Sequence, residues 1–193
     1  DIDINHAANL TVGARFIDCI FEGRASAGST IAGIDTNAAV VDTLTFDRCK
    51  FVTSHYAGEA FYFANTSAVV RRLAFTACAF SGTSAVFLRA AGNTRLTYNA
   101  THTTRHSVTV EGCSFKFDKT QMQTGTDVRQ VILVGWTNAV VKNNYFRGIG
   151  DFPVSVGNAY SYLSVASNCL GTTWSDNLMM WEGNNTFAVN RVG

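Results

Sequence analysis

One short pattern recurs six times along the chain and constrains the fold more than any other sequence feature. Each copy centres on a small residue, called the anchor below, which is Cys in four copies and Asn in two. The anchors are Cys19, Cys49, Cys78, Cys113, Asn144 and Asn168. Apolar residues stand five and three residues before each anchor and two residues after it. Such self-similarity predicts a solenoid of stacked units.

The apolar positions within one copy predict a strand, a bend and a second strand. Residues two apart lie on one face of a strand. The step from three residues before the anchor to two residues after it breaks that period, so we expect a bend with the anchor in its corner. The residues five before the anchors are Ala14, Leu44, Leu73, Val108, Ala139 and Leu163. Those three before are Phe16, Phe46, Phe75, Val110, Val141 and Val165, and those two after are Phe21, Phe51, Phe80, Phe115, Phe146 and Leu170.

A further element follows each anchor and also has the character of a strand. These elements are residues 29–37, 59–65, 85–93, 131–138, 152–158 and 178–184. Several alternate apolar and polar residues with a period of two, and each ends on Asn, which favours a turn. Each unit therefore predicts strand, corner, short strand, loop, strand and turn.

Two solenoid architectures fit this unit. The segment around each anchor matches the core of a leucine-rich repeat, whose second half should carry a helix or a Leu-rich turn. Here the second half carries aromatic and β-branched residues, which favour strands. We therefore predict an all-β, single-stranded, right-handed parallel β-helix of about six to seven coils, with a leucine-rich-repeat-like solenoid as the alternative.

Length and composition limit what the chain can be. Its 193 residues, 47% of them apolar, predict one domain over 1–193 with a real core. A net charge of +1 argues against a nucleic-acid partner, and no apolar run is long enough to insert in a membrane. Loop insertions are expected at 94–107 and 116–128. The pattern is incomplete at both ends, so we expect a fragment of a longer chain.

The Phe-x-x-Cys-x-Phe and Val-x-x-Asn-x-Phe repeats resemble those of the pectate-lyase-like β-helix superfamily, and within it bacteriophage tailspike proteins. The resemblance covers nearly all residues as architecture. It implies a homotrimer that attaches a phage to its host by recognising bacterial surface polysaccharide, with endoglycosidase or lyase activity in many members. A non-catalytic virion structural or adhesion β-helix and a secreted polysaccharide lyase are the alternatives.

The five cysteines are expected to be free, buried thiols used for packing, four of them at the corner positions and Cys169 beside the anchor Asn168. Unoxidised thiols fit folding in a reducing host cytoplasm, as for a virion protein of the phage tail, better than secretion. Their spacing does not match that of a metal site, and no cofactor motif is present, so neither a metal nor a cofactor is expected.

The two insertions carry the residue types that bind sugars, namely hydrogen-bonding side chains and an aromatic ring. The candidate substrate-binding residues are Tyr98, His102, Arg105, Asp118, Lys119 and, outside the insertions, Lys142. The alternative is that these loops are simply solvated.

The outward positions two residues before the anchors suggest a catalytic pair. They are Ile17, Asp47, Thr76, Glu111, Lys142 and Ala166. Asp47 and Glu111 should stand two coils apart, roughly 9–10 Å, near the ~6.5–9.5 Å between acid and base in inverting glycosidases. Glu111 would be the general acid and Asp47 the base. Lys142 beside Glu111 argues against that role, since the alternative is a charged, solvated face with Lys142 and Glu111 paired.

Overall fold

The computed structural model describes residues 11–23, 30–34, 40–53, 59–63, 69–82, 86–90, 105–118, 128–133, 136–149, 160–165, 169 and 171–182. Every regular element within these ranges is a β-strand, and the strands form three sheets in which all neighbours run parallel. The all-β prediction is therefore confirmed, and no described residue lies in the helix that a leucine-rich repeat would carry.

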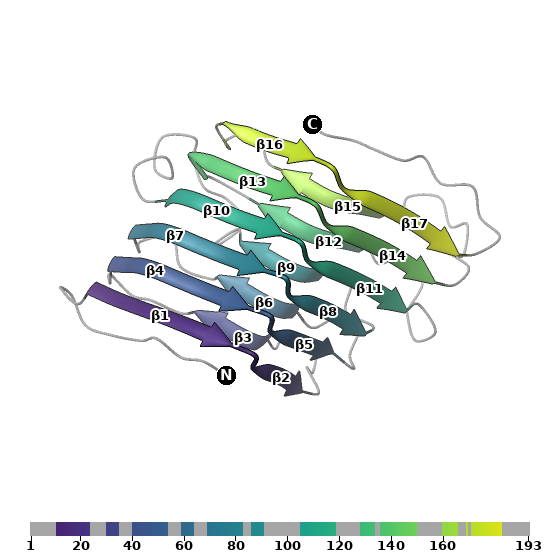
Figure 1. Ribbon diagram of the computed structural model, residues 1–193, viewed down its shortest axis with the longest axis horizontal. Helices are drawn as coiled ribbons and strands as arrows, with labels where there is room; N and C mark the ends of the chain where they lie inside the picture. The colour runs from purple at the N-terminus through teal and green to yellow at the C-terminus, as the bar shows by residue number, and fades with distance from the viewer. Residues whose placement is uncertain are drawn as a thin grey trace.

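Successive strands of the chain belong to the three sheets in turn. The first sheet contains β1 (Thr11–Ile17), β4 (Val40–Asp47), β7 (Val69–Thr76), β10 (Arg105–Glu111), β13 (Asn138–Lys142) and β16 (Thr172–Ser175). The second contains β2 (Ile20–Gly23), β5 (Lys50–Thr53), β8 (Ala79–Gly82), β11 (Ser114–Asp118), β14 (Tyr145–Ile149) and β17 (Leu178–Glu182). The third contains β3 (Thr30–Ile34), β6 (Glu59–Phe63), β9 (Val86–Ala90), β12 (Val128–Leu133) and β15 (Tyr160–Val165). Figure 1 shows the third sheet behind the other two, with its strands running in the opposite direction.

The pairing register places equivalent positions of the first five copies side by side. Phe16, Phe46, Phe75, Val110 and Val141 follow one another across the first sheet, and Phe21, Phe51, Phe80, Phe115 and Phe146 across the second. Neighbouring strands of a sheet are about 4.8 Å apart, so each position forms a column. The predicted columns are confirmed for these copies.

The sixth copy was predicted in the wrong place. Residues 160–165 form β15, which pairs with β12 in the third sheet, and Asn168 lies outside the described residues. The sixth corner lies between β16 and β17, with Asn177 as its anchor. Thr172, Trp174, Ser175 and Met179 therefore take the positions assigned to Leu163, Val165, Ala166 and Leu170. Apolar spacing alone matched a strand of the third sheet.

Three other element predictions also need correction. Residues 178–182 belong to the second sheet, whereas a strand of the second half was expected there. Residues 116–118 and 128, which were placed in an insertion, are parts of strands β11 and β12, and 105–107 belong to β10. The expected element at 152–158 lies outside the described residues, as do residues 94–104 and 119–127 of the two insertions.

Stacked phenylalanines fill the interior between the sheets. Ring centroids along the second-sheet column from Phe21 to Phe146 are 4.7–4.9 Å apart, with nearly parallel rings. Phe61 of the third sheet meets Phe46 and Phe75 of the first edge-on, at 5.5 and 4.9 Å. The side chains from Phe46 to Val141 in the first-sheet column and from Phe51 to Phe146 in the second-sheet column are fully buried. The three sheets therefore share one core.

Each corner between the first two sheets uses a residue in the left-handed conformation directly before the anchor. These residues are Asp18, Arg48, Ala77, Gly112, Asn143 and Asp176, with φ between 51° and 63°. Their amides continue the ladder around the bend, because Asp18 N–H donates to the carbonyl of Asp47 and Arg48 N–H to that of Thr76. The backbone of each repeat therefore stays hydrogen-bonded to the backbone of the next repeat through the corner.

The anchor side chains also bond along their own column. Cys78 Sγ donates to the carbonyl oxygen of Phe46 at 3.3 Å, and Asn144 Nδ2 donates to that of Val110 at 2.9 Å. Asn144 additionally accepts the Cys113 amide at Oδ1, at 2.8 Å. Thiol and amide thus donate to the same position, the carbonyl three residues before the preceding anchor, although the thiol is the weaker donor and the amide also accepts a bond.

Replacing Asn144 by Ala should lower the free energy of unfolding by about 2–4 kcal/mol, because the Cys113 amide and the Val110 carbonyl lose their partners in the interior. Urea denaturation followed by circular dichroism measures the change. Asn138→Ala, at an exposed position of β13, is the control and should change stability little. A loss in Asn144→Ala no larger than that in Asn138→Ala would contradict the bonding described here.

Replacing Gly82 by Ala should destabilise the protein by about 2 kcal/mol or more. Gly82 has a φ of 126°, and an added Cβ would collide with the carbonyl of Thr53 and lie 2.6 Å from Thr53 Oγ1. Gly13→Ala is the matched control, since its Cβ would meet nothing closer than 3.7 Å. Thermal denaturation compares the two, and equal effects would show that the close approach of β5 and β8 is not the cause.

Candidate functional site

An open hollow of about 590 Å³ lies on the outer face of the first sheet. It is lined by outward residues of β1, β4 and β7, namely Gly13, Arg15, Thr43, Thr45, Asp47, Arg72, Ala74 and Thr76, with atoms of Ala14 and Phe46. We call this the first-sheet hollow. Ala74 alternates with core residues Leu73 and Phe75 but is itself only 3% exposed, so its small side chain lies sheltered among larger neighbours in the lining of this hollow.

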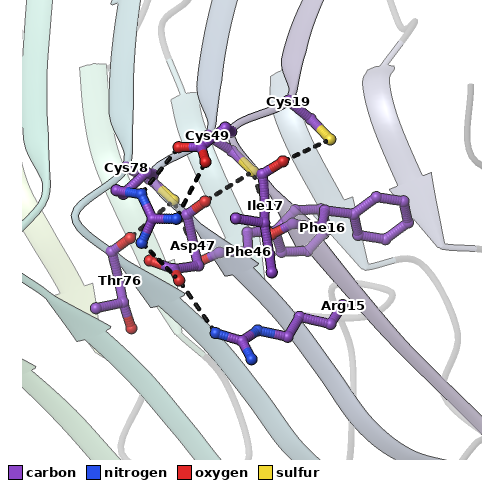
Figure 2. A network of polar contacts seen from close by, with 11 residues as sticks. Arg15, Phe16, Ile17, Cys19, Phe46, Asp47, Cys49, Thr76 and Cys78 are labelled. Carbon is purple, nitrogen blue, oxygen red and sulfur yellow. Dashed lines mark hydrogen bonds and ion pairs between the residues drawn. The ribbon is translucent and has the colours of Figure 1, made fainter.

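The carboxylate of Asp47 is held by two arginines from neighbouring corners and strands. Asp47 Oδ2 accepts hydrogen bonds from Arg15 Nη2 at 3.2 Å and from Arg48 Nη1 at 3.0 Å. The Asp47 side chain is 18% exposed, whereas Arg15 is largely exposed. Figure 2 shows Arg15 reaching across from β1 to this carboxylate beside Thr76. Asp47 is thereby fixed at one side of the first-sheet hollow.

Arg48 ties this carboxylate to the adjoining corner. Its Nε and Nη2 donate to both oxygens of Asp18, at 2.9 and 3.0 Å. This bond from Arg48 lowers the pKa of Asp18 and, in return, raises the pKa of Arg48. A bidentate pair of this kind fixes the planar guanidinium, which helps to hold Arg48 in its left-handed conformation.

The candidate catalytic residues Asp47 and Glu111 share one outward column, with Thr76 between them. Glu111 pairs with Lys142 of the next strand, at 3.0 Å between Oε1 and Nζ. Asp47 lines the first-sheet hollow and Glu111 is not among its lining residues. Both carboxylates therefore have cationic partners, and the acid and base roles remain predictions.

The remaining candidate binding residues are not brought together within the described part of the chain. Tyr98, His102 and Lys119 lie outside the described residues. Arg105 begins β10 in the first sheet, opposite Val70, whereas Asp118 ends β11 in the second sheet, opposite Ile149. Their roles in substrate binding stay predictions.

All five cysteines are free, as expected, but the expectation that all are buried is wrong for Cys19 and Cys169, which are partly exposed. The hydrogen bond with Cys78 and burial together raise the pKa of Cys113 well above that of an ordinary thiol, and burial raises the pKa of Cys49. These two thiols therefore stay protonated near neutral pH, and a protonated thiol is a poor nucleophile. They contribute to packing and to the bonds of the corner.

Two other kinds of site have no geometric support in the described ranges. Within them, no three His, Cys, Asp or Glu side chains are grouped so that they could hold a metal ion. No helix in the same ranges is long and apolar enough to cross a membrane.

Sequence reasoning missed the residues that define the first-sheet hollow. Arg15, Thr45 and Ala74 form one outward column, four residues before the anchors, and Thr43 lies beside Arg72 in another. The alternation of each strand already places these residues outward. Following every outward position across neighbouring repeats would therefore have identified these residues, whereas the sequence prediction used only the column two residues before the anchors.

Comparisons of the chain with protein-family models, with curated proteins and with solved structures find no match.

The Asp18–Arg48 ion pair should make stability depend on acidity in a defined direction. The folded-state pKa of Asp18 is lowered, so the stabilisation is present above the unfolded value, about 3.9, and is lost as the pH falls through the folded value. The Tm difference between the wild type and Asp18→Asn should therefore be constant near neutral pH and shrink below about pH 4. The difference should also shrink at high salt, since the pair is exposed.

Asp176→Asn provides the control for that measurement, because Asp176 occupies the same left-handed corner position with φ of 54°. Asn tolerates this conformation as well as Asp does, so both variants share any backbone effect. A pH-independent Tm difference for Asp18→Asn across the acid range would rule out the ion pair as a source of stability.

Proposed function

We propose that the chain is a segment of a right-handed parallel β-helix whose first-sheet face recognises bacterial surface polysaccharide. The strand order supports the architecture, because parallel strands enter the three sheets in strict rotation and in register. The observation that carries the functional proposal is the first-sheet hollow, an open surface across three strands rather than an enclosed pocket.

The chemistry of the first-sheet hollow suits sugars. Thr43 and Thr76 offer hydroxyl groups, and Arg15 and Asp47 offer a charged donor and acceptor held in fixed positions. The Thr45 hydroxyl is buried and lacks a hydrogen-bond partner among the described residues, so a sugar hydroxyl that reached it would satisfy it. Polysaccharide recognition requires several such groups along a line, and stacked strands supply them.

Recognition without cleavage is the function that the geometry supports best. A general acid must hold a proton and a base must take one, but Glu111 is paired with Lys142 and Asp47 with two arginines. These ion pairs favour the alternative of a non-catalytic virion adhesion β-helix over a glycosidase. A homotrimeric, virion-attached protein remains part of the proposal through the family resemblance.

Filling the first-sheet hollow should weaken binding. Ala74→Phe adds a ring to its lining, and we expect at least a tenfold loss of affinity for any bacterial polysaccharide that the wild type binds, as measured by glycan array and titration calorimetry. Ala79→Phe makes the same change on β8 of the second sheet and should leave binding intact. Equal binding by both variants would place the site elsewhere.

The same samples test for cleavage by release of reducing ends. We expect none from the wild type. If reducing ends appeared, their loss in both Asp47→Asn and Glu111→Gln would assign these residues as the predicted base and acid.

A further inference from the structure

The charge around the first-sheet hollow is unevenly balanced. Arg15, Arg48 and Arg72 stand in or beside it, against the carboxylates of Asp18 and Asp47. Arg15 and Arg48 are committed to those carboxylates through bonds of 2.9–3.2 Å. One positive charge is therefore left over at this place on a chain whose net charge is only +1.

Arg72 carries that remaining charge. It is exposed, lines the first-sheet hollow, and has no ion pair among the residues that the structure describes. Its chain neighbour Arg71 is different, because Arg71 Nη1 donates to Asp42 Oδ1 at 2.8 Å and Arg71 does not line the hollow. The two adjacent arginines thus differ in two respects, because Arg72 alone lines the hollow and Arg71 alone has an acidic partner among the described residues.

The surroundings of Arg72 fit an anionic group on a sugar ring. Thr43 and Ser107 flank it on the two neighbouring strands, so hydroxyl oxygens lie on both sides. Ala74, two residues further along β7, leaves space next to it for a ring. A guanidinium presents a planar pair of donors, which matches the two oxygens of a carboxylate.

We propose that the first-sheet hollow selects acidic sugars, with Arg72 binding the carboxylate of a uronic-acid or similar residue within the polysaccharide. This inference rests on the proposed function and adds the chemical class of the ligand. Asp47 is neutralised by Arg15 and Arg48, so it does not repel such a ligand strongly.

The test uses the full chain and pairs of ligands that differ only in charge. Acidic oligosaccharides from bacterial capsules, together with oligogalacturonate, are presented as free acids and as their methyl esters. Titration calorimetry should give roughly tenfold tighter binding of the acid than of the ester, and the preference should weaken as NaCl is raised. Sulfated oligosaccharides and free sulfate, added separately, show whether any anion is accepted or only a carboxylate on a sugar.

Arg72→Gln should remove the preference, so that acid and ester bind with the affinity of the ester. Arg71→Gln makes the same charge change beside it and should keep the preference. If the wild type binds acid and ester equally, selection by Arg72 is wrong while polysaccharide binding stands. If it binds none of the pairs and no neutral glycan, the proposed function itself is overturned, and an unchanged preference in Arg72→Gln would assign selection to another residue.

Discussion

The bond from each anchor side chain to the carbonyl three residues before the preceding anchor is the contact on which the rest of the structure depends. Cys78, Cys113, Asn144 and Asn177 each make it, across one strand spacing. It occurs at a left-handed corner, where it adds to the backbone hydrogen bonds that carry the ladder around the bend. These bonds act together with the backbone hydrogen bonds of the corner, so each anchor stays beside the preceding one and the register of both adjoining sheets, with its phenyl columns and outer face, continues through the bend.

Much of this fold could be predicted, because the corner leaves a pattern in the sequence. A small anchor between apolar residues at fixed offsets identified five corners and the columns on either side. The sixth was missed because Trp174 and Met179 replace the Val and Phe of the pattern, while residues 163–170 imitate it. The residue directly before the anchor was a further signal in the sequence. Asp176 stands before Asn177, as Asp18 and Asn143 stand before their anchors, and Asp and Asn tolerate the left-handed conformation of the corner.

Less of the candidate site could be predicted. That Asp47 and Glu111 face outward in one column follows from alternation, and the pairing of Glu111 with Lys142 follows from register. The first-sheet hollow does not follow from either. It depends on Ala74 being small where its neighbours are larger, and on Arg15 reaching one strand across to Asp47. The direction of such a side chain depends on its packing against neighbouring strands, and the spacing of residues along the chain does not predict it.

The alternation of inward and outward residues along β4 and β7 separates the residues that hold the core together from those that form the outer surface. Leu44, Phe46 and Phe75 are buried between the sheets, whereas Thr45 and Arg72 point the other way from adjacent positions. A mutation at an outward position can therefore have little effect on the ring contacts of the phenyl columns, which lie on the other face of the sheet. The outer surface can diversify among descendants while the scaffold is retained, and the same independence allows an engineer to exchange outward columns as a set.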